Sequence, residues 1–317
     1  MSSSRLLAGL LAGLLSVGAV ASGPDSVRSS ALADNGLKKE DFPRWQKVAS
    51  DAYIFEGVHS PDPSGALFTT VSLVVITQEG VLVVDGQGNV AESQQLIDRI
   101  KKVTSQPVKY VVVGSDHGDH TGGNAAFTSA YPDAVFVSTA FSKDALARSK
   151  NAAVPSKLVK DRETIKLGGT EIQVLNLGRA HTGGDLVVYL PASKVLFMSE
   201  VYLRGLFPAM RSAYPSEWLA TIDKALAMDV SLYIPGHGFT DEGPAMKRDL
   251  VEFKKATQSV IAESKRLHAA GLKCESAKNC PAIEQANWGP YKKWPASGSQ
   301  GPVAVAKVYQ ELEGKLP

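Results

Sequence analysis

Two hydrophobic periodicities alternate along the middle of the chain. β-Branched apolar runs at 80–86 and 108–114 predict two buried strands. Between them, apolar residues recur at helical spacing over residues 91–103. Strand, helix and strand therefore follow one another, which is the order typical of α/β proteins.

The same alternation continues on both sides of this unit. We expect a helix from Ala125 with Asn124 as its N-cap, then a strand at 134–138 and a helix from Ser142. The other expected strands are 48–57, 69–78, 166–177 with a turn at Gly168-Gly169, 185–190 and 195–198, and the other expected helices are 216–228, capped by Ser216, and 244–270. The pattern predicts an α/β sandwich followed by a helical C-terminal extension.

Length and composition limit the number of domains and the class of protein. The 317 residues, 44% hydrophobic and 21% charged, suffice for one large domain or two ordinary ones and exclude disorder throughout. Residues 1–21 carry one cation, an apolar stretch and a small-residue ending, which predicts a secretory signal peptide and a periplasmic or secreted protein. A retained anchor is the alternative, but the run is shorter and richer in Gly and Ala than a spanning helix requires. We expect residues 22–46 to form a flexible leader.

Charge and cysteine content narrow the class of partner. Loss of Arg5 with the signal peptide leaves 33 of the 34 basic residues against 32 acidic ones, and the basic residues are scattered. This balance argues against a nucleic-acid partner. In an exported protein Cys274 and Cys280 are expected to pair, because no histidine neighbours them to suggest a metal site.

The candidate chemistry begins directly after the strand at 108–114. His117, Asp119 and His120 lie within four residues, followed by Gly122-Gly123. Two imidazoles and a carboxylate are nitrogen and oxygen donors that suit zinc. An ordinary polar surface loop has the same residue types, so the interpretation depends on distant partners.

Such partners follow three further apolar runs. They are His181 before Thr182 and a Gly184-Asp185 pair, Glu200 after the strand at 195–198, and His237 between two glycines. Four of the six histidines thus fall in these motifs, and we assign no ligand role to His59 or His268.

The order and contexts of these motifs resemble the metallo-β-lactamase-fold hydrolases over residues 47–245. The resemblance implies an αββα sandwich of two mixed β-sheets flanked by helices, with residues 246–317 as a helical extension packed on the domain. The implied metal ligands are His117, Asp119, His120, His181, Glu200 and His237. Asp85, at the end of the strand at 80–86, would support the metal loop behind the ligands.

Two residues depart from the family pattern. Ser115 stands where the family has its first histidine, and Glu200 stands where it has a bridging Asp or Cys. The first metal position would keep only His117 and His181, whereas the second would keep Asp119, His120 and His237, with Glu200 able to complete it. We therefore expect one or two zinc ions, with the second position tighter. Asp116 is a conceivable replacement for the missing histidine.

These features predict an exported zinc-dependent hydrolase that uses metal-activated hydroxide on a small carbonyl substrate such as an ester, lactone or cyclic amide. With a single ion, Asp119 or His117 would act as general base. The alternatives are a true β-lactamase and a metal-binding protein with little catalysis. After signal removal no stable membrane insertion is expected.

Candidate substrate contacts lie in two irregular segments. The first is residues 59–68, between two predicted strands, and the second is residues 201–214, which contain Arg204 and Arg211. An arginine there is a candidate to meet an anionic substrate group, and a plain surface position is the commoner alternative for each. Trp288, Tyr291 and Trp294 are expected to pack the C-terminal extension onto the domain.

Overall fold

The computed structural model describes residues 27–59, 68–149 and 153–317. The predicted signal peptide and most of the candidate substrate segment at 59–68 lie outside these ranges. Within them, no helix combines the length and apolar character needed to cross a bilayer.

The described residues form two β-sheets. The larger sheet has the order β1-β2-β3-β4-β5-β6-β7 and the smaller one has the order β12-β11-β10-β9-β8. The strands of the larger sheet are β1 (Arg44–Lys47), β2 (Ala52–His59), β3 (Phe68–Ile76), β4 (Val81–Val84), β5 (Val108–Val112), β6 (Val135–Ser138) and β7 (Lys157–Leu158). Those of the smaller sheet are β8 (Arg162–Leu167), β9 (Thr170–Leu175), β10 (Val187–Leu190), β11 (Val195–Phe197) and β12 (Leu232–Ile234).

Both sheets are mixed. Strands β1 to β4 are antiparallel neighbours, whereas β4 to β7 run parallel. In the smaller sheet only the β11–β12 pair is parallel. The parallel strands need crossover connections, and the α-helices that precede β12 lie in these connections, whereas two further α-helices follow β12.

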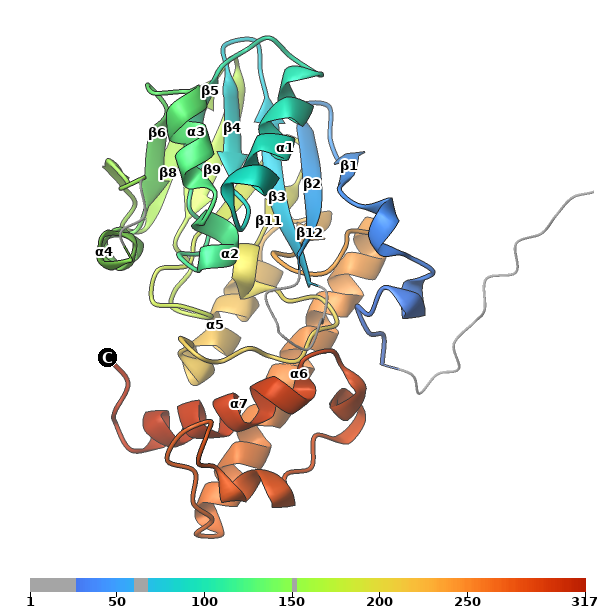
Figure 1. The fold of residues 1–317 in the computed structure, drawn as a ribbon, viewed down its shortest axis with the longest axis vertical. Coiled ribbons are helices and arrows are strands. Elements are labelled where there is room, and N and C mark those ends of the chain that lie inside the picture. Colours follow the sequence, from blue (N-terminus) through green and yellow to red (C-terminus); the bar gives the residue numbers. More distant parts are fainter. Residues whose placement is uncertain (1–26, 60–67, 150–152) are drawn as a thin grey trace, which may run out of the picture.

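The helices cover the outer faces of the sandwich (Figure 1). The α-helices are α1 (Val90–Lys101), α2 (Gly118–Thr121), α3 (Asn124–Ala130), α4 (Ala140–Arg148), α5 (Pro215–Leu226), α6 (Gly243–Ala269) and α7 (Ser297–Leu312). The 3₁₀ helices are Ala33–Asn35, Lys39–Asp41, Ser199–Val201, Pro281–Gln285 and Gly289–Lys293.

Three apolar clusters hold these layers together. Side chains such as Leu73 and Phe197, from opposite sheets, share the core between the sheets. Leu96 of α1 and Phe127 of α3 pack on the outer face of the larger sheet. Helices α5, α6 and α7 enclose the third cluster, on the outer face of the smaller sheet. The predicted αββα sandwich is therefore confirmed.

The C-terminal segment is part of this third cluster. Trp288, Tyr291 and Trp294 are 7%, 6% and 2% exposed, and all three belong to the cluster with α6 and α7, as expected. Cys274 and Cys280 form a disulfide that closes the short loop after α6.

Three local predictions were wrong. The expected strand at 48–57 begins only at Ala52, as β2, because the chain turns between Lys47 and Ala52, and the strand β1 before that turn was not predicted. Asn124 is the first residue of α3 and Gly123 occupies the N-cap. Ser216 lies inside α5, where its hydroxyl donates to Glu311 of α7. In the last case a tertiary partner replaced the local cap.

The described part of the expected flexible leader makes specific contacts. Arg28 pairs with Asp241 at 2.8 Å, and the Ser30 amide donates to the Gly205 carbonyl at 3.0 Å. This part of the segment therefore has fixed partners on the domain.

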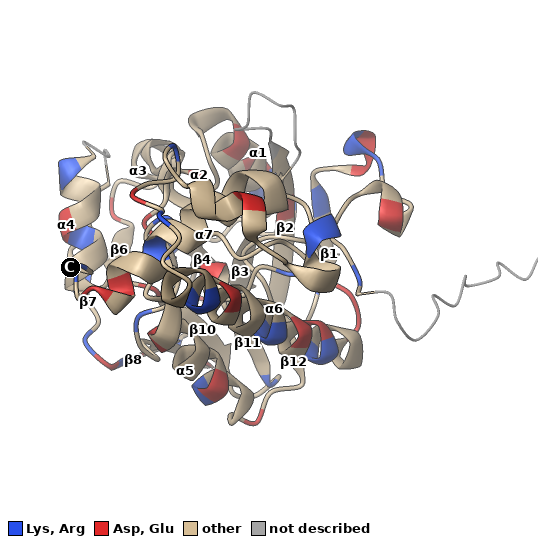
Figure 2. Ribbon diagram, turned by 90° about the horizontal axis from the view of Figure 1, so that it is seen from below, with Lys and Arg blue, Asp and Glu red and all other residues tan. Residues whose placement is uncertain are grey.

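Charged residues are interspersed on the helical face (Figure 2). Basic and acidic residues alternate along α6, and ion pairs such as Lys254–Asp223 link it to α5. The surface of α6 consequently carries both positive and negative side chains along its length.

Substitution Phe253→Ala should destabilise the fold strongly. Phe253 is fully buried on α6 against the rings of Tyr202 and Trp218. We expect a loss of about 3–5 kcal/mol in the free energy of unfolding, because the cavity cannot close fully. Denaturant titration measures it. The control Phe141→Ala, at a side chain 39% exposed, should change stability by less than about 0.5 kcal/mol. Equal effects would contradict this account of the third cluster.

Candidate metal centre

The six predicted ligand residues come from loops at one end of the sandwich. His117, Asp119 and His120 follow β5, and His120 lies in the short helix α2. His181 lies between β9 and β10, and Glu200 lies in the 3₁₀ helix after β11. His237 follows β12, which pairs with β11 in parallel. Because the carboxyl ends of parallel strands share an edge, residues far apart in sequence meet there.

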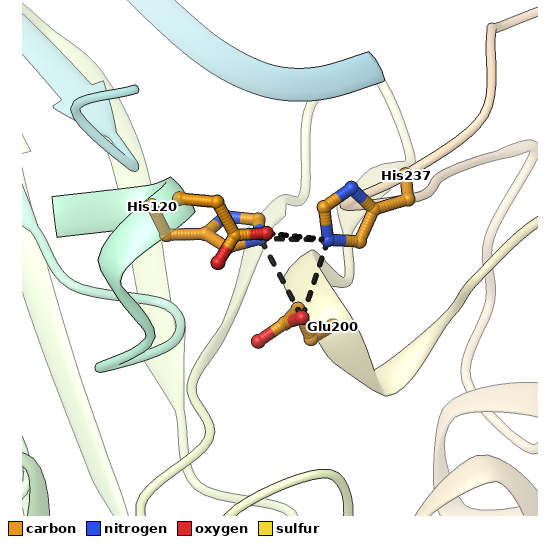
Figure 3. Close-up of side chains that lie close together, drawn as sticks. His120, Glu200 and His237 are labelled. Atoms are coloured by element: carbon orange, nitrogen blue, oxygen red, sulfur yellow. Dashed lines mark hydrogen bonds and ion pairs between the residues drawn. The ribbon is translucent and has the colours of Figure 1, made fainter. Parts of the chain in front are cut away.

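The first of two donor groups contains Asp119, His120, Glu200 and His237. Figure 3 labels the last three of these residues. The His237 Nε2 lies 3.2 Å from the His120 Nε2, the Asp119 Oδ2 and the Glu200 Oε1. Ligand atoms held at 2.0–2.2 Å by one tetrahedral zinc would lie roughly 3.3–3.6 Å apart. The spacing therefore suits a single ion.

The hydrogen bonds behind the two imidazoles determine their tautomers. The His237 Nδ1 lies 2.7 Å from the Thr69 carbonyl oxygen, which can only accept, so Nδ1 carries the proton. The His120 Nδ1 lies 2.9 Å from an oxygen of the Asp85 carboxylate and donates to it in the same way. In the neutral rings both Nε2 lone pairs consequently face each other. A metal ion between them, or a proton on one of the two Nε2 atoms, relieves that repulsion, and the first of these is the arrangement of metal-binding histidines.

The second donor group contains His117, His181 and Glu200. The His117 Nδ1 lies 3.1 Å from the His181 Nε2 and 2.9 Å from the Glu200 Oε2. The outer nitrogen of His117, Nε2, lies 3.1 Å from the Ser212 hydroxyl. Glu200 thus belongs to both groups.

The two remaining residues of the predicted first motif differ in their surroundings. Ser115 is fully buried, and its hydroxyl donates to the Glu200 Oε2 at 2.5 Å. Asp116 is in neither donor group among the described residues. The structure therefore does not place Asp116 where it could replace the missing histidine.

Asp85 connects the ligand loops from behind. Besides His120, its carboxylate accepts from the Gly114 amide at 2.7 Å and from the Ser199 hydroxyl at 2.5 Å. Asp85 and Ser199 both have a positive φ, 62° and 46°, which is uncommon for residues with a side chain. Two residues with strained backbone conformations are thus hydrogen-bonded to each other, at the place where the loops after β4, β5 and β11 converge.

A glycine permits the approach of His237 to Glu200. A Cβ on Gly236 would lie 2.5 Å from the Ser199 carbonyl carbon. The Gly236 amide instead donates to the Ser199 carbonyl at 2.7 Å. Any larger residue at 236 would push the loops after β11 and β12 apart.

The charges of the two groups depend on each other. Burial lowers the pKa of His117, but the Glu200 carboxylate outweighs it and raises the pKa to about 9. Burial likewise lowers the pKa of His237, while Asp119 and Glu200 raise it well above its usual value. Burial raises the pKa of Glu200, but the imidazoles of His181, His117 and His120 outweigh it and hold the pKa well below its usual range. The acidic groups therefore favour positive charge among the imidazoles.

Arg204 is a correction to the candidate substrate contacts. It is 3% exposed, and its guanidinium pairs with Asp249 at 2.8 Å and Asp241 at 2.6 Å. Its charge is thus neutralised within the fold. Neither a substrate contact nor a plain surface position describes it.

Three residues with contacts at the site were not predicted from the sequence. Thr69 acts through its backbone carbonyl, which leaves no signal in the residue type. Ser212 lies in the segment 201–214, which was expected to flank the site, but nothing distinguished this hydroxyl. Ser199 could have been suspected from its place beside Glu200.

Comparison with known proteins agrees with the family resemblance seen in the sequence motifs. The profile of the Metallo-beta-lactamase superfamily matches residues 64–237. A metallo-beta-lactamase type 2 of Bacillus sp. (strain 170) is 26% identical over 181 residues, which cover 55% of this chain and 69% of that protein. A linear primary-alkylsulfatase of a Pseudomonas species is 21% identical over 234 residues, covering 58% of this chain and 44% of that protein.

Solved structures show the same fold. The metallo-beta-lactamase from Pontibacter korlensis superposes with a TM-score of 0.59 at 22% identity, covering 67% of this chain and 98% of that one. At this identity the likeness concerns the fold alone. Together with the two donor groups, these relatives indicate that the chain uses a metal.

Substitution Asp85→Asn should weaken metal binding. An amide can donate to the His120 Nδ1, which would move the ring proton to Nε2 and block the lone pair that a metal needs. We expect metal affinity to fall about 10–100-fold. Competition with a chromophoric chelator measures it. The control Asp51→Asn removes a carboxylate that accepts from Thr170, outside both donor groups, and should leave affinity unchanged. Wild-type affinity in Asp85→Asn would refute the tautomer argument.

Proposed function

Since the chain belongs to the metallo-beta-lactamase superfamily, we propose that it is an exported zinc-dependent hydrolase of small esters, lactones or cyclic amides. The observation that carries the proposal is the 3.2 Å approach of the His120 and His237 Nε2 atoms, with Asp119 and Glu200 beside them. Without a metal, the buried carboxylates must be balanced by protonated imidazoles, whereas a bound metal ion would balance the same charges through its ligand bonds.

The proposed zinc ligands are the residues of the two donor groups. Asp119, His120 and His237 hold the second metal position, and His117 and His181 contribute to the first. Glu200 touches both groups. When bound, zinc lowers the pKa of a water molecule toward neutrality and polarises a substrate carbonyl.

Asp119 is the better placed of the two proposed proton acceptors. Its side chain is 29% exposed, against 12% for His117. The outward nitrogen of His117 is 3.1 Å from the Ser212 hydroxyl, so it already has a partner. Burial raises the pKa of Asp119, but the imidazoles of His120 and His237 outweigh it and hold the pKa below its usual value. Asp119 is consequently ionised near neutral pH and can orient and deprotonate a water molecule.

Export is supported by two independent features. Residues 1–21 have the composition of a signal peptide. Cys274 and Cys280 form a disulfide, and disulfides persist mainly in oxidising compartments such as the periplasm.

A true β-lactamase is the second candidate, because the metallo-beta-lactamase type 2 of Bacillus sp. is among the relatives. The alkylsulfatase relative shows that the family name does not determine the substrate. A chromogenic cephalosporin and a carbapenem separate this candidate from the ester and lactone hydrolase.

Zinc removal should abolish turnover and zinc addition should restore it. We would treat the full-length protein with a chelator, dialyse it, and measure hydrolysis of nitrophenyl esters, lactones and β-lactams during zinc titration. Activity that rises with bound zinc supports the proposal, because the two groups otherwise offer only imidazoles and carboxylates.

Three results of this titration would count against the proposal. Zinc bound without turnover on any substrate would favour a metal-binding protein with little catalysis. Absence of metal binding would overturn the proposed zinc-dependent hydrolase function altogether. Turnover confined to β-lactams would favour the second candidate.

Substitution Asp119→Asn should lower kcat per bound zinc by about 10²–10⁴-fold, since an amide cannot accept the proton. Bound zinc is measured on the same samples, so that a lost ion is not mistaken for lost proton transfer. The matched control is Asp229→Asn, at an exposed carboxylate paired with Lys194. If Asp119→Asn kept the wild-type kcat per zinc, another group would be the base.

A further inference from the structure

Ser115 and Glu200 are the two departures from the family pattern, and they touch each other. The Ser115 hydroxyl donates to the Glu200 Oε2 at 2.5 Å, and both residues are buried, at 0% and 3% exposure. A serine leaves room that an imidazole would fill. The longer carboxylate enters that room.

The two oxygens of Glu200 face different donors. Oε2 lies 2.9 Å from the His117 Nδ1 and accepts from Ser115. Oε1 lies 3.2 Å from the His237 Nε2 and 3.0 Å from the His181 Nε2. The carboxylate thus lies between the groups and presents an oxygen to each.

Side-chain length determines whether both groups can be reached. Aspartate is shorter than glutamate by one carbon–carbon bond, about 1.5 Å. With the backbone at 200 held by the 3₁₀ helix Ser199–Val201, a shorter carboxylate would withdraw from the Ser115 side. The extra methylene of Glu200 therefore allows its carboxylate to reach both donor groups.

We propose that Glu200 replaces the missing imidazole, so that His117, His181 and Glu200 form a complete three-ligand first position and the chain holds two divalent ions. Ser115 is a positioning residue that orients the Glu200 Oε2. Three protein ligands with an open position is the usual composition of a catalytic zinc site. The inference rests on the proposed function for the metal, and it replaces the expected weak first position with a competent one.

The test is the metal content of four full-length proteins. Wild type, Glu200→Asp, Ser115→His and the double variant Ser115→His/Glu200→Asp are loaded with zinc, dialysed and measured by mass spectrometry. We expect two equivalents in wild type, one in Glu200→Asp, and two again in the double variant, where an imidazole takes over the vacated place. Glu56→Asp is the matched control, because Glu56 is another fully buried glutamate outside both donor groups.

Cobalt(II) substitution identifies which ion is lost. The visible spectrum of cobalt-loaded Glu200→Asp should match that of His181→Ala, which lacks a ligand of the first position only. A match to His237→Ala instead would overturn the inference, because the second position would then be the one that depends on the length of Glu200.

The outcomes separate this inference from the proposed function. One equivalent in wild type with zinc-dependent turnover would overturn the inference and leave the hydrolase standing. Two equivalents in Glu200→Asp, with unchanged affinities, would also overturn it. No metal in wild type would overturn both.

The positioning role of Ser115 has its own test. Ser115→Ala removes the donor to the Glu200 Oε2, and we expect the affinity for the first-position ion to fall about 10–100-fold. Ser115→Thr keeps the hydroxyl and should restore most of that affinity. Equal affinities in Ser115→Ala and wild type would show that the hydroxyl does not position Glu200.

Discussion

The opposed imidazoles of His120 and His237 are the constraint on which the rest of the site depends. Their Nε2 atoms lie 3.2 Å apart, and hydrogen bonds to Asp85 and to the Thr69 carbonyl hold both protons on the far side of the rings. Two lone pairs at that distance repel each other unless a metal ion or a proton lies between them. The fold can maintain this geometry only because strands from both sheets end at the same edge.

The energetic cost of this arrangement is spread over the surrounding structure. Asp85 and Ser199 adopt left-handed backbone conformations and are hydrogen-bonded to each other. Gly236 has no side chain, which allows the loops after β11 and β12 to contact each other. Each of these features is unfavourable in isolation. The core between the sheets, built from residues such as Leu73 and Phe197, supplies the stability that tolerates them.

Ser115 and Glu200, the two departures from the family pattern, are hydrogen-bonded to each other in a buried polar site. A serine in the place of a histidine would leave a gap, and a glutamate in the place of an aspartate would be too long. Together they are complementary in shape and form a 2.5 Å hydrogen bond. The space left by the small side chain at position 115 and the length of the side chain at position 200 match each other. Both depend on the distance between the loops after β5 and β11.

Local pattern alone determined a large part of this protein. The β-branched runs at 80–86 and 108–114 and the helical spacing between them specified a buried βαβ unit, because periodicity depends only on neighbouring residues. The residue types of the six candidate donors and their places after apolar runs are also visible in the sequence, and the resemblance to the family singled them out as ligands. Tertiary structure alone decided that Glu200 contacts both donor groups, that Ser115 bonds to it, and that Arg204 is neutralised inside the fold. Those outcomes depend on distances between loops far apart in the chain, and packing of the two sheets sets such distances.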